Sequence, residues 1–139
     1  MRKLILIIGL MSFSTFLFTQ EVELTIQINE VRTSQGNIIL GIYDNAKSFP
    51  KDGKAILVLS VKAEKPTKVV KVDLPKGTYA IALSHDINNN GTCDTNFIGY
   101  PTEPFAFSNN VRPRLSAPSF SSASFELNKN TTIQIKLIH

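Results

Sequence analysis

The residues best suited to chemistry stand together in the segment HDINNNGTCDTN, residues 85–96. Side chains with oxygen atoms occupy alternate positions in the order D-x-N-x-N-G-x-x-D, and Gly91 permits a sharp turn among them. Oxygen atoms are the ligands that Ca²⁺ takes in proteins, and loops of this kind curl around the ion. The segment is therefore a candidate calcium loop. Its expected ligands are the side chains of Asp86, Asn88, Asn90 and Asp94 and the backbone carbonyl of Thr92.

Two features of this loop make the expected calcium affinity weak. The twelfth position, where an EF-hand places a bidentate glutamate, is Phe97, so the shell needs water or a distant residue such as Glu103. Only two of the four side-chain ligands carry a charge, so we expect a dissociation constant on the order of 10⁻⁴–10⁻³ M. The alternative is a plain turn whose Asn and Asp side chains bond to their own backbone.

The same region offers few groups to an enzyme. His85 continues, at period two, the apolar face of the residues before it, so we expect it to bond to a backbone carbonyl at the rim of the core. Cys93 is the only cysteine, which excludes an intrachain disulfide and a zinc site of several thiolates. We expect it to be half-buried, and nothing marks the acids of this region as buried. The expectation is a protein without catalytic residues. The alternative is an envelope hydrolase or a thiol-dependent enzyme that uses the region His85–Glu103.

Alternation of apolar and polar residues predicts the elements that position this loop. Period-two patterns occur throughout the chain after residue 21, and no segment there sustains a helical apolar stripe. Seven strands are expected, at residues 22–29, 37–44, 55–61, 67–74, 78–85, 124–127 and 133–137. Without helices to make crossovers, a parallel sheet is disfavoured. The sequence therefore predicts an all-β protein, an antiparallel two-sheet sandwich of the Ig-like or prealbumin-like kind.

Glycine and proline punctuate these strands at expected turns. The polar cluster around Gly36 and the dipeptide Asp52-Gly53 separate early strands. In LPKGTY, Pro75 is expected to open a hairpin turn, and Gly77 is expected to close it in the left-handed conformation. Each of these signals places a connection between two strands.

The first residues predict a secretory signal peptide. Met1, Arg2 and Lys3 precede an apolar run over residues 4–18, which also holds Ser12, Ser14 and Thr15. A membrane-spanning helix needs about 20 apolar residues, so this run fits an export signal better. We expect residues 1–19 to be the signal peptide and residues 20–139 to be one domain. The mature chain is expected in the periplasm, on the outer surface or outside the cell, without a transmembrane segment. The alternative is a retained N-terminal anchor.

Charge and aromatic residues indicate the kind of partner. Without Arg2 and Lys3, the 15 basic residues fall to 13 against 11 acidic residues, and the lysines are dispersed. No basic block interleaved with aromatics is present, so no nucleic-acid partner is expected. The segment 97–120 is a long loop rich in proline and aromatic residues. Phe97 and Phe107 are expected to cap the open end of the sandwich. Tyr100 and Phe105 could equally meet a protein or glycan partner at the loop end.

The longest run of motifs carries a resemblance. It comprises Gly77 and Tyr79, His85 to Gly91, Asp94-Thr95-Asn96, Gly99, Pro101 and Glu103, and Phe107 to Asn110, with Pro118-Ser119-Phe120 following. In these motifs the chain resembles a bacterial family of small exported proteins known as domain-of-unknown-function family 2141. The resemblance covers essentially the whole mature chain, and Cys93 departs from it, since a larger aliphatic residue is expected there. The family implies a small β-sandwich and no assigned activity. We therefore expect an exported, non-enzymatic binding or structural module of the bacterial envelope.

The signal-peptide interpretation predicts the mass of the secreted protein. Export with cleavage after Thr19 leaves a chain that begins near Gln20, because the apolar run is removed. Intact-mass measurement of the protein recovered from the periplasm or medium checks this. A secreted form that retains Met1 through Phe18 contradicts it and favours an anchor.

Overall fold

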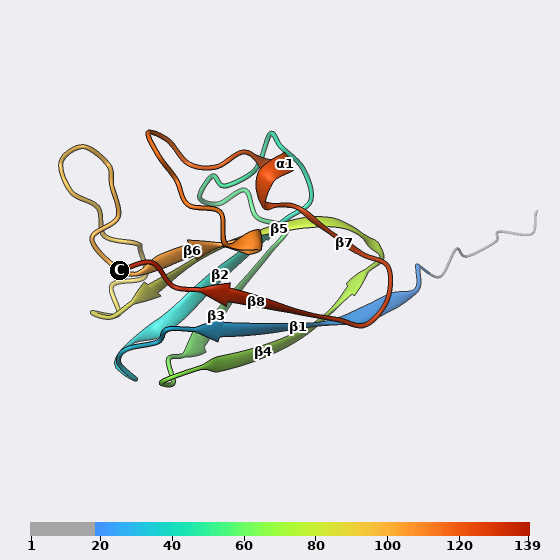
Figure 1. The fold of residues 1–139 in the computed structure, drawn as a ribbon, viewed down its shortest axis with the longest axis horizontal. Coiled ribbons are helices and arrows are strands. Elements are labelled where there is room, and N and C mark those ends of the chain that lie inside the picture. The colour runs from blue at the N-terminus through green and yellow to red at the C-terminus, as the bar shows by residue number, and fades with distance from the viewer. Residues whose placement is uncertain (1–18) are drawn as a thin grey trace, which may run out of the picture.

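The computed structural model describes residues 19–139, which form two β-sheets packed face to face (Figure 1). The expected signal peptide, residues 1–19, lies almost wholly outside the described residues. The strands are β1 (Glu21–Asn29), β2 (Asn37–Tyr43), β3 (Leu57–Lys62), β4 (Lys68–Pro75), β5 (Gly77–Asp86), β6 (Phe105–Phe107), β7 (Phe125–Leu127) and β8 (Thr131–Lys136). Two short helices, η1 (Ser108–Asn110) and α1 (Phe120–Ala123), complete the elements. The all-β, two-sheet prediction is confirmed.

The smaller sheet has the order β4-β1-β8. β1 pairs with β4 antiparallel, with Ile26 opposite Val70, and with β8 parallel, with Ile26 opposite Ile133. The expectation of antiparallel pairing throughout is therefore wrong at this edge. Residues 128–130 carry the chain from β7 to this sheet, where β8 starts beside Leu24 and runs in the direction of β1. No helix is needed for this crossover, because the connection runs between the two sheets.

The larger sheet has the order β3-β2-β5-β6, and β7 also pairs with β5. All of its pairings are antiparallel. β6 lies within the segment that the sequence predicts as a long loop, because three residues are too few to show a period. β3 is an edge strand, so its second apolar row is not covered, and Val58 is 57% exposed.

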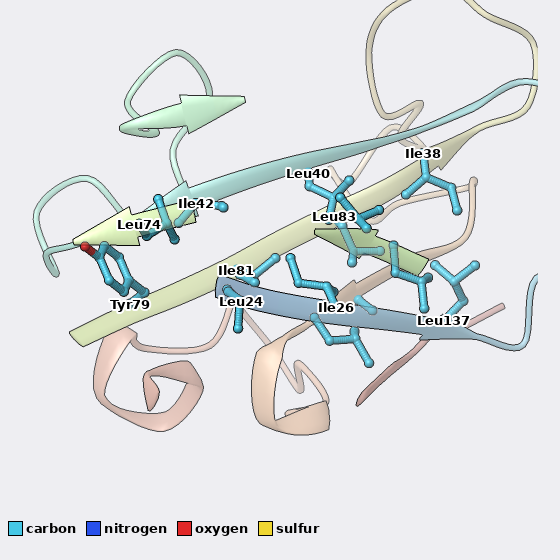
Figure 2. Packing of buried hydrophobic residues seen from close by; sticks show 14 of the residues in the cluster. Leu24, Ile26, Ile38, Leu40, Ile42, Leu74, Tyr79, Ile81, Leu83 and Leu137 are labelled. Carbon is cyan, nitrogen blue, oxygen red and sulfur yellow. The ribbon is translucent and has the colours of Figure 1, made fainter. Parts of the chain in front are cut away.

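Aliphatic side chains from both sheets fill the space between them (Figure 2). Leu24 and Ile26 from β1 face Leu40 from β2 and Ile81 from β5, and all four are fully buried. These are the residues whose alternation predicts the strands. Burial of one such side chain contributes about 1.5–3 kcal/mol, so this shared layer holds the sheets together.

The chain passes from one sheet to the other at Lys76, between β4 and β5. The hairpin that LPKGTY predicts is therefore wrong, since β4 pairs with β1 and β5 pairs with β2. Gly77 does not have a positive φ either. A Cβ there would make an ordinary van der Waals contact with the ring of Tyr79, whose hydroxyl donates to the carbonyl of Pro75 at 2.7 Å.

A second apolar cluster lies on the outer face of the larger sheet. It consists of Tyr43, Phe49, Ala80 and Ala123, with Phe107 and Phe120 packed against it. Ser108 ties this layer to β5. Its buried hydroxyl accepts the N–H of Ile81 at 2.9 Å and donates to the carbonyl of Ala123 at 2.5 Å. Leaving such a buried N–H unpaired costs about 1–3 kcal/mol, so the serine continues the β5 ladder where β6 ends.

Helical content agrees with the prediction from the sequence. The described residues hold no helix longer than the four residues of α1. Among those same residues, no helix is long and apolar enough to cross a membrane.

Candidate functional site

The outer face of the larger sheet carries a hollow of about 400 Å³. Its floor is made of small residues on the two central strands: Gly41 on β2, and Ala82 and Ser84 on β5. Gly41 and Ala82 stand directly opposite each other in the strand register. Because Ala82 and Ser84 have short side chains, the β5 part of this floor lies close to the sheet backbone.

Aromatic residues and two loops form the walls of the hollow. Tyr43, Phe105 and Phe107 contribute rings from the sheet. Residues 50–55 form one wall, and residues 91–93 with Pro101 form the opposite one. The ring of Tyr43 lies over Gly41, where a Cβ would come within 2.9 Å of it. Glycine at this position therefore keeps the Tyr43 ring flat against the sheet.

A few polar groups also line the hollow, namely the side chains of Asp52, Ser84, Thr92 and Cys93. The Tyr43 hydroxyl donates to the carbonyl of Lys51 at 3.3 Å, which ties the first wall to the sheet. Burial and the nearby Asp52 carboxylate raise the pKa of Tyr43, so its phenol stays protonated. The hollow is therefore apolar in most of its surface, with a few hydrogen-bonding groups on its floor and walls.

Asp86, the first residue of the candidate calcium loop, is buried at the end of β5. The sequence alone does not indicate this burial. Its carboxylate accepts two backbone N–H groups, from Asn90 to Oδ1 at 3.1 Å and from Gly91 to Oδ2 at 2.8 Å. The turn has positive φ at Asn89 and Gly91. Asp86 therefore stabilises the loop's own backbone.

The other three predicted side-chain ligands, Asn88, Asn90 and Asp94, lie in contact with one another. Asn88 and Asn90 donate their amide groups to the two carboxylate oxygens of Asp94, each at 2.7 Å. The amide oxygen of Asn88 accepts the N–H of Asn90, and that of Asn90 accepts the N–H and hydroxyl of Thr92. The structure therefore gathers the predicted ligands into one network of internal hydrogen bonds.

Glu103, considered above as a distant calcium ligand, fastens the loop at its base. Its carboxylate accepts the N–H of Ile87 at 2.9 Å and that of Asp94 at 3.1 Å. The described part of the chain has no group of three or more His, Cys, Asp or Glu placed to hold a metal ion. Calcium binding by this loop stays a prediction.

His85 has the position that its spacing predicts. The side chain points to the inner face of β5 and is fully buried, and Nε2 lies 2.7 Å from the carbonyl of Gln35. Its Nδ1 has no partner among the described residues. Since Ser84 and His85 alternate along the strand, the imidazole lies on the opposite side of the sheet from the hollow.

Cys93 is half-buried, as predicted, and lines the hollow. Burial raises the pKa of its thiol, and the Glu103 carboxylate raises it further, against the smaller opposing effect of a hydrogen bond with Ser84. A nucleophilic cysteine needs the reverse, a depressed pKa. The sheet also lies between this thiol and His85, so the two do not form a catalytic pair.

The position of Phe97 differs from the one expected from the sequence. The sequence predicts it as a cap on the sandwich, yet its side chain is fully exposed, and Ile98 beside it is 73% exposed. Tyr100 packs edge-on against Phe105, with ring centroids 5.7 Å apart. Phe107 does cover the protein, but on the outer face of the larger sheet, where it contacts Phe49.

Sequence reasoning missed the hollow. The signal was present in the small residues Ala80 and Ala82, which alternate with large apolar residues along β5. A half-buried strand with alanines on its second face indicates either close packing or an open floor, and only the structure distinguishes the two.

The raised pKa of Cys93 predicts its reactivity. A raised pKa means that the thiolate, the reactive form, develops only at higher pH, so alkylation of the folded protein by iodoacetamide at neutral pH should be slower than alkylation of the unfolded chain. The pH dependence of the alkylation rate gives the apparent pKa in both states. Glu103→Gln should lower the folded value, since it removes a nearby negative charge. A folded pKa below the unfolded one contradicts this account and favours the thiol-enzyme alternative.

Comparison with known proteins places the chain among its relatives. The family model described as "Uncharacterized protein conserved in bacteria (DUF2141)" matches residues 26–134. Neither the curated proteins nor the solved structures contain a match to the chain. The matched range includes the motifs from Gly77 to Phe120 on which the resemblance was based, and it spans both sheets. The chain therefore belongs to the bacterial family DUF2141.

Proposed function

We propose that this protein is an exported, non-enzymatic binding module that holds a small, largely apolar ligand in the hollow on its larger sheet. The observation that carries the proposal is the hollow itself, about 400 Å³ with a floor of small residues and aromatic walls. Ligand sites in proteins are concave, mostly apolar and about 300–1,000 Å³ in size, with a few polar groups that orient the ligand. The hollow fits this description.

The polar groups that line the hollow indicate which groups the ligand carries. The Asp52 carboxylate can only accept hydrogen bonds when ionised, and the Ser84 hydroxyl can accept one. A ligand with an apolar body and a hydroxyl or amine group would complement both. A sugar ring carries hydroxyl groups around its edge, and the lining offers few side chains that can pair with them, those of Asp52, Ser84, Thr92 and Cys93. The lining of the hollow therefore favours a largely apolar molecule over a sugar.

The non-enzymatic part of the proposal is supported by the two groups that an enzyme would use first. The Cys93 thiol has a raised pKa, and His85 faces the core with Nε2 against a carbonyl. Export is supported by the basic and apolar start of the chain, residues 1–18. In a bacterial family, export would take the protein to the periplasm, the outer surface or the medium.

A filling substitution tests the hollow. Ala82→Leu should lower the affinity for the neutral apolar dye N-phenylnaphthylamine by at least about tenfold, because the added carbons occupy the floor of the site. Binding is measured as a saturable rise in dye fluorescence. Val69→Leu is the matched control, since Val69 is exposed on β4 of the other sheet, and it should leave dye binding unchanged.

Two outcomes would contradict the proposal. Equal dye binding by the wild type and Ala82→Leu would place the dye elsewhere. Saturable displacement of the dye by a simple sugar, at concentrations that leave a control protein unaffected, would favour a glycan ligand. Thermal unfolding of both variants verifies that the fold survives the substitutions.

Weak calcium binding by residues 86–94 is a second candidate function, and one observation favours it. Asn88, Asn90 and Asp94 already lie around one point, and rotating each amide would turn its oxygen toward the Asp94 carboxylate. This rotation breaks the hydrogen bonds that the amide oxygens now accept, which agrees with a weak affinity.

Calcium binding predicts a rise in melting temperature. A ligand that binds only the folded state adds roughly 1.4 kcal/mol at a tenfold excess over its dissociation constant, which corresponds to a few degrees. Asp94→Asn should abolish the rise, and Asp73→Asn, on exposed β4, should not. Magnesium should stabilise less, because it demands tighter octahedral geometry. An unchanged melting curve in millimolar calcium means that the loop is a turn alone.

A further inference from the structure

A protruding loop between β5 and β6 has exposed apolar residues at its apex. This tip loop, residues 94–103, projects beyond the sandwich at the left of Figure 1. Phe97 is fully exposed, Ile98 is 73% exposed and Tyr100 is 46% exposed. No charged residue occurs between Asp94 and Glu103. Large adjacent apolar residues at the end of a projection mark a site of contact with another phase or molecule.

Hydrogen bonds within the tip loop hold its backbone. The Asn96 side-chain oxygen accepts the N–H of Ile98 at 3.1 Å and that of Tyr100 at 2.9 Å. Backbone bonds run from Asn96 to Tyr100, from Gly99 to Asn96 and from Thr102 to Asp94. Gly99 has a positive φ, which a tight turn of this shape requires.

These internal hydrogen bonds lower the cost of moving the loop from water into a less polar medium. A backbone N–H that loses water without gaining a partner costs several kcal/mol in hydrocarbon. In the tip loop, six N–H groups are already paired, those of Asp94, Asn96, Ile98, Gly99, Tyr100 and Thr102. The loop can therefore leave water at a reduced cost.

Polarity rises in steps from the apex to the base of the tip loop. Phe97 and Ile98 stand at the apex, and Tyr100 follows with its ring against Phe105. Asp94 and Glu103 stand at the base, where Glu103 accepts two backbone N–H groups. A lipid bilayer shows the same order of polarity from its interior to its surface: acyl chains, then a region favoured by tyrosine, then charged headgroups.

We infer that the tip loop inserts into the interface of a lipid bilayer, with Phe97 and Ile98 entering the acyl boundary. The area favours lipid over a protein partner. A stable protein interface buries about 800 Å² on each side, far more than three exposed side chains provide. A bilayer needs no complementary surface, so a few exposed side chains at the apex of a loop are enough to insert into it. Since the loop is uncharged at its apex and acidic at its base, insertion depends on apolar contact and does not require anionic lipid.

The apical residues 97–100 do not line the hollow. Membrane insertion can therefore hold or fail separately from ligand binding in the hollow.

A single tryptophan tests the insertion, because the chain contains none. In Phe97→Trp, the indole is the sole one in the protein and replaces an exposed aromatic ring, so the fold is not at risk. Phosphatidylcholine vesicles should shift its emission to shorter wavelength, and brominated phosphatidylcholine should quench it. The shift should persist in high salt and should not need phosphatidylglycerol.

The control is Val69→Trp, which places the indole at an exposed position on β4 of the smaller sheet. It should show neither shift nor quenching, which also separates the tip loop from any lipid affinity of residues 1–18. In the Phe97→Trp background, Ile98→Ser should weaken vesicle binding by about tenfold, since one apical side chain is lost. Unchanged indole emission of the Phe97→Trp variant with vesicles overturns the inference, and so does a shift seen only with phosphatidylglycerol and lost in salt.

Discussion

β5 pairs with β2 on one side and with β6 and β7 on the other, and its side chains alternate between two different environments. Tyr79, Ile81, Leu83 and His85 enter the layer between the sheets. Thr78, Ala80, Ala82 and Ser84 face outward and are small. Large residues on the first face give the sheets a common core. On the second face, Ala80 is covered by the second apolar cluster, and Ala82 and Ser84 form part of the floor of the hollow. A register slip of one residue would exchange the two faces, so the core and the hollow both depend on this alternation.

In the loop after β5, carboxylates supply the hydrogen-bond partners that regular secondary structure would otherwise provide. Residues 87–104 contain no strand or helix, so their backbone N–H groups need other partners. Asp86 accepts two of them and Glu103 accepts two more. Charge-assisted bonds of this kind are stronger than neutral ones, which gives an irregular segment a defined shape. The spacing of oxygen-bearing side chains that predicts a cation loop therefore also lets those side chains accept the backbone N–H groups of their own turn.

The sequence predicts best where a local pattern has one physical solution. Alternation identifies β1, β2, β4 and β5, and Gly36 marks a turn with positive φ, as expected. His85 is predicted to face the core because period two leaves no other direction. Prediction fails where the partner is remote: β8 beside β1, and the change of sheet at Lys76. It also fails at Phe97, because hydrophobicity favours burial and gives no sign of a residue held outside.

The hollow and the tip loop share one supporting structure. Residues 91–93 and Pro101 form a wall of the hollow, while residues 97–100 form the apex of the tip loop. Both parts are fixed to the end of β5 by Glu103, which accepts the N–H of Ile87 and of Asp94. The Glu103 carboxylate therefore fastens a loop whose base, at residues 91–93 and Pro101, lines the hollow and whose apex, at residues 97–100, is exposed.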